Sequence, residues 1–498
     1  MKSSYILFLI VLLQVSCKRD LDLKPTSVIT SNSFFKAETD VTGAVYGMYQ
    51  LLRVEVANAN LYFLGEARSE IMTSSLGGTL GYDKYYQQTL SATNPGPNWQ
   101  GLYAVINSAN LVLKYAPDIA FSSAVTKNNM IAQAYTMRAY MYFTLVRSWG
   151  DIPLRTEPTE GYDPQTIQVA RSPKAEVFAL IKADLDKALS LYATNTFTAG
   201  RNTWSKPAAN ALKADVYLWS GKQLGGGNAD FTIALAAIAD IPTSDVQLLP
   251  NFADVFDYNT KGNKEVIMAV RFQLLENVRS TAPVIGPDNL YANMYIQTTN
   301  IPASAPQVTK DLIGVGGGQN IWGPTAAVRS QFTSDDLRRN GTFLEIFATT
   351  ASGPLYFATL NMKGKGVVSG GTRFFVNDVM LYRYADILLM KAEAKNALGQ
   401  DPTTEVNLVR QRAYGTNYNS HIFVNGTKVQ NDDAILQERL LEFLYEGKRW
   451  FDLIRFNKVF ELVPLLKNRS AETHLLLFPV GSDVLSLEPK ITQNTGWQ

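Results

Sequence analysis

The feature that most constrains the fold is a long run of apolar residues at helical spacing between Lys127 and Ser148. Offsets of three and four residues place these side chains on one face of an α-helix, and other elements must then cover that face. Gly150 and Pro153 follow the run and predict the end of the helix. We therefore expect a chain built around packed helices. The apolar positions are Ile131, Ala134, Tyr135, Ala139, Tyr142, Phe143 and Val146.

Similar spacing predicts further helices on both sides of this segment. Ser172 and the segment 431–433 are the N-cap candidates for two of them. Three segments, 137–150, 212–225 and 390–402, each carry a basic residue, an Ala, an apolar stretch and a closing Gly. They resemble degenerate tetratricopeptide helix hairpins at irregular spacing. The further helices are expected from about residue 34, and over about 99–115, 173–191, 207–222, 230–239, 378–398, 402–414, 433–446 and 448–457.

A long insertion, residues 242–376, interrupts the helical pattern. One strand is predicted there, from Val266 to Phe272, followed by long loops rich in Pro and Gly. The glycines of 314–323 are expected to let the backbone place Trp322 at a surface, since a P-loop ending of Gly-Lys-Ser/Thr is absent. Loops of this length in a compact domain are usually functional. The expected regions are 17–240, mainly helical, 241–376, loop-rich with candidate ligand-binding residues, and 377–498, again helical.

The N-terminus gives a reason for the single cysteine. After Lys2, an apolar run from Tyr5 to Leu13 is too short to span a bilayer and fits the apolar region of a secretory signal. The small residue Ser16 precedes Cys17 directly, as in a bacterial lipoprotein signal. We expect residues 1–16 to be a signal peptide and Cys17 to be lipidated; an ordinary signal peptide or a buried N-terminal cysteine is the alternative.

Composition excludes several classes of function. The 46 basic and 44 acidic side chains of the 498 residues leave a formal charge of only +2, which argues against nucleic-acid binding. One cysteine excludes an internal disulfide, and two histidines argue against a zinc site. The motifs Gly-x-Ser-x-Gly and His-Glu-x-x-His are absent. We expect no metal, no cofactor and no catalytic residues.

The densest charged segment is 437–456. Glu438, Glu442 and Glu446 are four residues apart and share one helical face. Nearby charges can pair with them, so we interpret the segment as a structural ion-pair network; a glycosidase acid and base is the alternative. The charged neighbours are Arg439, Arg449, Asp452 and Arg455.

Aromatic residues make up 11% of the chain and suggest the ligand class. Sugar rings stack on flat aromatic side chains, while amides bond to their hydroxyls. Loop aromatics beside amides are therefore our candidate ligand-binding residues, whereas Trp99, Trp149 and His474 are interpreted as structural. The candidates are Tyr82, Tyr85, Tyr86, Tyr291, Tyr295 and Trp322, together with Asn320.

Several motifs in order resemble the SusD/RagB family of outer-membrane lipoproteins. They are TDVTGAVYGMY (39–49), NWQGLYAVINSANLVL (98–113), AYTMRAYMYFTLVRSWGDIPL (134–154), RYADILLMKAEAKNALG (383–399), VRQRAYG (409–415), ERLLEFLYEGKRWFDLIRF (438–456) and the C-terminal segment 477–497. The C-terminal segment departs from the family pattern at Glu488 and Thr495.

The resemblance implies a mainly α fold, with tetratricopeptide-like hairpins beside an irregular, loop-rich ligand-binding half. It also implies non-catalytic capture of an oligosaccharide or polysaccharide at the outer membrane, and delivery to a TonB-dependent SusC-like transporter. Capture of a peptide by the same scaffold, and a scaffold whose repeats bind only protein, remain as alternatives.

Overall fold

The computed structural model describes residues 34–78, 80–161, 163–274 and 288–497. The predicted long helix is α7 (Ala124–Trp149), which ends at Gly150, as expected, but begins earlier than expected, after its N-cap Ser123. Burial goes beyond the predicted stripe, because every residue from Thr136 to Trp149 is buried. Other elements cover both sides of this helix, among them α6 (Gln100–Tyr115) and α9 (Lys174–Leu191).

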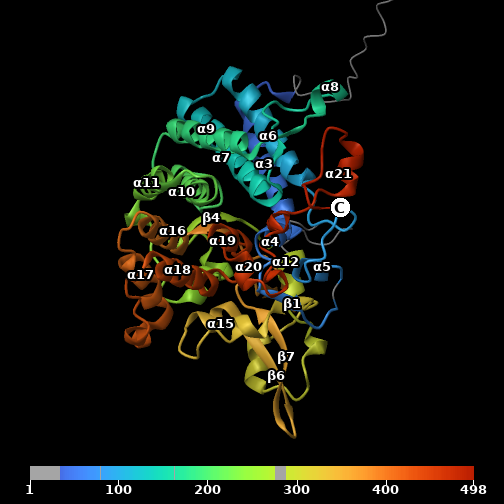
Figure 1. Ribbon diagram of the computed structural model, residues 1–498, viewed down its shortest axis with the longest axis vertical. Coiled ribbons are helices and arrows are strands. Elements are labelled where there is room, and N and C mark those ends of the chain that lie inside the picture. Colours follow the sequence, from blue (N-terminus) through green and yellow to red (C-terminus); the bar gives the residue numbers. More distant parts are fainter. Residues whose placement is uncertain (1–33, 79, 162, 275–287, 498) are drawn as a thin grey trace, which may run out of the picture.

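The remaining helices pack on one another largely in chain order (Figure 1). In the upper part of the view, α3 (Glu38–Ala57) packs on α6, and α9 leads to α10 (Lys206–Gln223) and α11 (Gly227–Ala239). The C-terminal helices α16 (Tyr384–Ala397), α17 (Thr403–Tyr414), α18 (Lys428–Phe443) and α19 (Arg449–Arg455) continue from α11. The predicted mainly α class with packed helical hairpins is confirmed.

The strands form five separate antiparallel pairs within the described residues. The region 242–376 was expected to hold one strand and long loops, and that expectation is wrong in part. It contains β4 (Val266–Val270), β5 (Trp322–Pro324), β6 (Phe343–Thr350), β7 (Gly353–Asn361), β8 (Val367–Ser369) and β9 (Thr372–Phe374). The pair β6–β7 forms the hairpin at the bottom of Figure 1. The remaining elements of these pairs are β1 (Met72–Ser74), β2 (Ile152–Pro153), β3 (Arg171–Ser172) and β10 (Val379–Arg383).

Several predicted element starts differ from the structure. Helix α9 has Pro173 as its N-cap, and the Asp151 carboxylate accepts the N–H of Lys174 at 2.8 Å, while Ser172 lies in β3. Helix α18 begins earlier than expected, after Thr427, whose side chain forms a capping box with Gln430. The segment 379–383 is strand β10, so α16 starts only at Tyr384.

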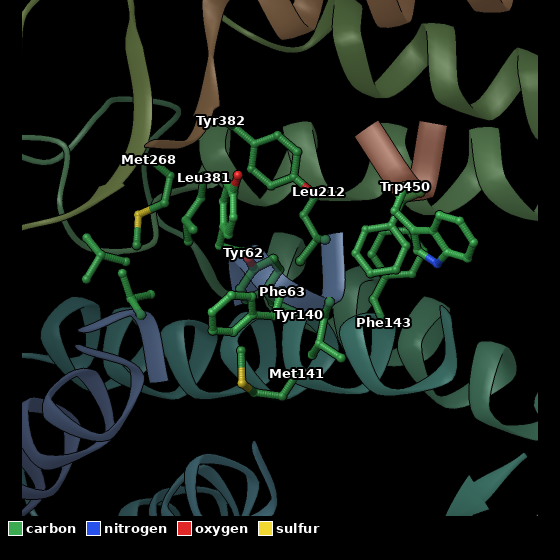
Figure 2. Packing of buried hydrophobic residues seen from close by; sticks show 14 of the residues in the cluster. Tyr62, Phe63, Tyr140, Met141, Phe143, Leu212, Met268, Leu381, Tyr382 and Trp450 are labelled. Atoms are coloured by element: carbon green, nitrogen blue, oxygen red, sulfur yellow. The ribbon is translucent and has the colours of Figure 1, made fainter. Parts of the chain in front are cut away.

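One large cluster of buried hydrophobic residues extends from Phe35 to Ile491. Figure 2 shows part of it, where Tyr140 and Phe143 of α7 face Leu212 of α10 and Trp450 of α19. Tyr62 and Phe63 of the short helix α4 (Asn60–Gly65) enter the same core. The regions distinguished in the sequence therefore share one core.

Candidate functional site

The structure brings together the three loops that carry the predicted ligand-binding residues. Strand β1 pairs with β5, so that Ser74 lies opposite Trp322. The backbone of Ile321 joins two of the loops, because its carbonyl accepts the N–H of Ser75 at 2.8 Å and its N–H donates to Asn293 O at 2.7 Å. Segments far apart in the sequence thus lie side by side.

The aromatic side chains of two of these loops pack around Phe63, while Tyr295 packs on Phe375 instead. Its ring lies parallel to Tyr85 at a centroid distance of 4.8 Å and close to parallel to Tyr82 at 5.0 Å. Trp322 meets Tyr82 edge-on at 4.7 Å and also contacts Tyr62. Tyr62 and Phe63 are not among the predicted site residues, although two adjacent aromatic residues in NLYFLG are a visible signal.

The expectation that Trp322 reaches a surface is wrong, because its side chain is only 1% exposed. The glycines of 314–318 were expected to bring Trp322 to a surface, but in the structure they help to bury it. A Cβ on Gly318 would lie 2.3 Å from Ala292 O, and one on Gly316 would lie 2.3 Å from Thr298 N. These glycines let two backbone segments pack closely, and that packing holds Trp322 inside.

Four further candidates are also buried and cannot present a face to a ligand in this structure. Tyr85 lies under Phe63, and the hydroxyl of Tyr295 donates to Ile313 O at 3.1 Å. Tyr291 packs so tightly on Gly364 that a Cβ there would lie 2.1 Å from the ring. Asn320 is a structural bridge, because its amide donates to Thr359 O at 3.0 Å and its carbonyl accepts the Ser75 hydroxyl.

Tyr82 and Tyr86 are the candidates that keep exposed surface, since both are half-buried. Tyr82 is the N-cap of the single turn α5 (Asp83–Tyr86) and Tyr86 is its last residue, and a spacing of four residues places them on one face. Exposed Ser74, Gln87 and Gln319 belong to the same loops. We call Tyr82, Tyr86, Ser74 and Gln319 the aromatic platform.

The electrostatics of the platform suit an uncharged polyol. Burial raises the pKa of Tyr82 and of Tyr86 above that of free tyrosine, so both hydroxyls stay protonated at neutral pH and can donate hydrogen bonds. Hydroxyl and amide groups beside an aromatic face can bond to sugar hydroxyls while the ring stacks on apolar C–H groups.

The glutamates of 437–456 are part of a buried ion-pair network, as predicted, and are not open to a ligand. The predicted partners are wrong, because the glutamates pair with basic residues from outside the segment, whereas Arg439 and Arg449 pair with Asp452 and Glu70. Arg383 bonds to Glu442 at 2.5 Å and to Glu446 at 2.9 Å, and Arg338 bonds to Glu438 at 2.6 Å. Burial opposes ionisation of Glu442, but Arg412, Arg383 and Arg338 outweigh it and hold its pKa well below the ordinary value. Carboxylates committed to guanidinium groups are unavailable as the acid and base of a glycosidase.

Several open clefts lie outside the platform, and two of them border helices α6 and α3. One, of about 450 Å³, lies between α6 and α21 (Ser482–Leu487), and some of its polar groups pair with one another, as Asn98 does with Asp483 at 2.6 Å. The other, of about 490 Å³, lies between α3 and β4.

Other expectations concern single residues. Trp99 and Trp149 are buried, as predicted, and the half-buried ring of His474 packs edge-on against Trp497. Cys17 and the signal segment 1–16 lie outside the described residues. Among the residues that the structure describes, no group of three or more His, Cys, Asp or Glu side chains could hold a metal ion, and no helix has the length and apolar character needed to span a membrane.

Known proteins resemble this chain over almost its whole length. Residues 21–218 match the family model described as starch-binding associating with outer membrane, and residues 320–497 match that of the SusD family. The solved structure of B. fragilis NanU is 32% identical, with a TM-score of 0.83, over 96% of this chain and 100% of that chain. A SusD superfamily protein from Bacteroides vulgatus is 30% identical, with a TM-score of 0.81, over 93% of this chain and 100% of that chain.

A SusD-like protein of Formosa agariphila is 25% identical, and the match covers 96% of this chain and 95% of that protein. The two family models lie at the two ends of the chain, and the structural matches also cover the region between them. The chain belongs to the SusD family.

Proposed function

We propose that this protein binds a glycan on the aromatic platform without cleaving it. The observation that carries the proposal is half-buried Tyr82, which stacks on Phe63 and meets Trp322 edge-on. Half-buried Tyr86 lies four residues further along, and exposed Ser74 and Gln319 belong to the same loops. The names of two proteins of the same fold support it. One is a laminarin binding SusD-like protein and the other is surface glycan-binding protein A from Bacteroides fluxus.

We further propose that the protein sits at the outer membrane through a lipid on Cys17 and delivers its ligand to a TonB-dependent SusC-like transporter. The lipoprotein-like signal before Cys17 supports the anchor. The family model whose description includes association with the outer membrane supports the location. Because several acyl chains give a stable anchor, the body needs no membrane-spanning helix of its own.

The test is calorimetry of the purified chain without its signal peptide. The chain is titrated with a glycan that a glycan array has identified as a ligand and, separately, with a pool of random tripeptides. We expect a glycan to bind, Tyr82→Ala to weaken it at least tenfold, and Tyr418→Ala to bind normally. Tyr418 is a matched control because it is also half-buried but lies beside α17, on the opposite side of the molecule from α5 (Figure 1). Binding of peptides alone, or glycan affinity unchanged in Tyr82→Ala, would refute the proposal.

A further inference from the structure

The cleft between α6 and α21 has the features of a second binding site and shares no residue with the platform (Figure 1). One wall is the face of α6 that carries Gln100, Ala104 and Asn107, which spacings of four and three residues align. The opposite wall is α21 together with the residue that follows it, Glu488. A volume of about 450 Å³ is within the range of clefts that hold small molecules.

The charges that line this cleft leave a negative surplus. Among its lining residues, all within the described ranges, Asp483 and Glu488 are acidic and Arg155 is basic. Arg155 pairs with Glu488 at 3.3 Å. Asp483 accepts a hydrogen bond from the neutral amide of Asn98 at 2.6 Å and pairs with no basic residue in the part of the chain that the structure describes. One carboxylate charge is therefore left without a compensating cation.

A second observation points to a ligand that carries a hydrogen-bond donor. The Oε2 atom of Glu488 is buried and has no hydrogen-bond partner among the described residues. Buried polar atoms of folded proteins are nearly always paired, so an atom without a partner calls for a group that binds it. Because Arg155 pairs with the other carboxylate oxygen, Oε1, an N–H group of a ligand can bond to Oε2 without displacing Arg155.

The open apolar surface of the cleft is aliphatic. Leu487 of α21 is 76% exposed, and Ala104 on the facing wall is also exposed. The aromatic residues of the lining are less open, because Trp99 is buried and the hydroxyl of half-buried Tyr103 is bonded to Pro153 O at 2.7 Å. Aliphatic chains with a charged end lie along apolar surface and keep the charge at its edge. The cleft therefore suits an alkyl chain better than a sugar ring, which stacks on flat aromatic faces.

Amide groups on the α6 wall can bind the rest of a ligand. The side chain of Gln100 is exposed and has no partner within the described ranges. The side-chain carbonyl of Asn107 accepts the backbone N–H of Thr159 at 2.7 Å, so its NH2 group remains available as a donor. These amides can bond to the peptide groups on either side of a lysine or arginine.

We propose that this cleft binds an ammonium or guanidinium group carried on an aliphatic chain, as a second site separate from the aromatic platform. The cation pairs with Asp483 and donates to Oε2 of Glu488, since charge-assisted hydrogen bonds are stronger than neutral ones. The aliphatic chain lies along Leu487 and Ala104. A lysine or arginine within a peptide and a free aliphatic amine share this chemistry. The inference goes beyond glycan binding and does not rest on it.

The test is a ligand-observed NMR titration of the chain without its signal peptide. The probes are Nα-acetyl-lysine methylamide, which mimics a lysine within a peptide, and cadaverine, a free aliphatic diamine. We expect at least one of them to bind, and added salt to weaken it. Their counterparts acetylated at the amine nitrogens should bind at least tenfold more weakly, because they carry no charge. A lysine probe that binds more tightly than cadaverine assigns the site to peptides, and any other order assigns it to free amines.

Variants tie the binding to this cleft. Asp483→Asn should weaken the bound probe at least fivefold. Glu176→Gln is the matched control and should bind normally, because it removes an exposed carboxylate in the first turn of α9, outside the cleft. Ala104→Trp places a large side chain at an exposed position of the α6 wall, so it should abolish probe binding without removing a charge.

Glycan binding at the platform separates the two sites. Ala104→Trp should keep the melting temperature and the glycan affinity of the unmodified chain, so failure of the cation site is distinct from failure of the proposed function. The inference is overturned if neither probe binds, if an acetylated counterpart binds as well as its amine, or if Ala104→Trp binds the probe normally.

Discussion

The ring of Trp322 packs edge-on against Tyr82 with a centroid distance of 4.7 Å. Buried Trp322 thus supports half-buried Tyr82, and the two residues have different roles in the proposed site. Tyr82 is placed to contact a ligand, while Trp322 fixes the position of Tyr82 and fills the core beneath it. The consequences of this arrangement can be measured separately.

Replacement of Trp322 should lower the stability of the fold, and it should affect glycan binding only through that loss. Trp322→Ala leaves a cavity beside Tyr62, Phe63 and Tyr82, and should lower the free energy of unfolding by about 3–5 kcal/mol in a urea titration. Trp322→Phe keeps most of the ring contacts and should cost less. Lost glycan affinity with an unchanged unfolding midpoint would show that Trp322 contacts the ligand directly.

The contributions of the ring and of the hydroxyl of Tyr82 to glycan binding can be tested separately. Tyr82→Phe keeps the stack on Phe63 and removes one hydrogen-bonding group, so it should retain more glycan affinity than Tyr82→Ala, which loses at least about 1.4 kcal/mol for a tenfold change. Calorimetry at matched temperature measures both. Equal losses in the two variants would mean that the hydroxyl, and not the ring face, carries the interaction.

Gly318 should tolerate no side chain. A Cβ in Gly318→Ala would lie 2.3 Å from Ala292 O and 2.4 Å from Tyr295 O, so the two backbone segments must separate and the melting temperature should fall. Gly43→Ala in α3 is the matched control, because a Cβ there meets no atom within 4 Å. The control should gain up to about 1 kcal/mol from helix propensity. A melting temperature unchanged in Gly318→Ala would contradict the close packing.

The buried ion-pair network should make the fold acid-sensitive. Burial opposes the ionisation of Glu446, but Arg383 and Lys363 outweigh it and lower its pKa to about 2. The pKa of Glu442 is also held well below its ordinary value, against burial, by Arg412, Arg383 and Arg338. Because the folded state then binds fewer protons than the unfolded state, the contribution is complete above about pH 4.5 and is lost as the pH falls toward 2.

Urea titrations between pH 2 and 7 measure this loss. Glu446→Gln removes a partner of buried Arg383 and should cost about 3–5 kcal/mol at pH 7, with a flatter pH dependence below pH 4.5. Glu461→Gln, whose carboxylate is 60% exposed, should leave the profile unchanged. A profile of Glu446→Gln parallel to that of the unmodified chain would refute the assignment.

Cys17→Ser should release the protein from the membrane. Without the thiol no acyl chain can be attached, and the described body has no helix suited to span a bilayer. Fractionation should move the variant from the detergent-extracted membrane fraction to the aqueous one. If the variant stays with the membrane, the proposed anchor is wrong.

Much of the fold was predictable because helix signals are local. The apolar spacing of 127–148, with Gly150 at its end, correctly predicted α7, and the glutamate spacing of 437–456 predicted the ion-pair network. The strands of 242–376 were mostly missed, because they are short and pair with partners that no local pattern reveals. The start of α18 was missed because Thr427, and not the later polar residues, carries the capping box.

Local sequence patterns were enough to predict most of the helices and the family. Which side chains of the candidate loops are exposed depends on how these loops pack in the folded chain. A tyrosine in a loop looks the same in the sequence whether it is buried or exposed. In the folded chain, close contacts at Gly316, Gly318 and Gly364 bury the aromatic side chains of these loops, namely Trp322, Tyr291 and Tyr295. The structure also created the cleft of Asn98 and Asp483, 385 residues apart, because packing of α6 beside α21 is a property of the folded core.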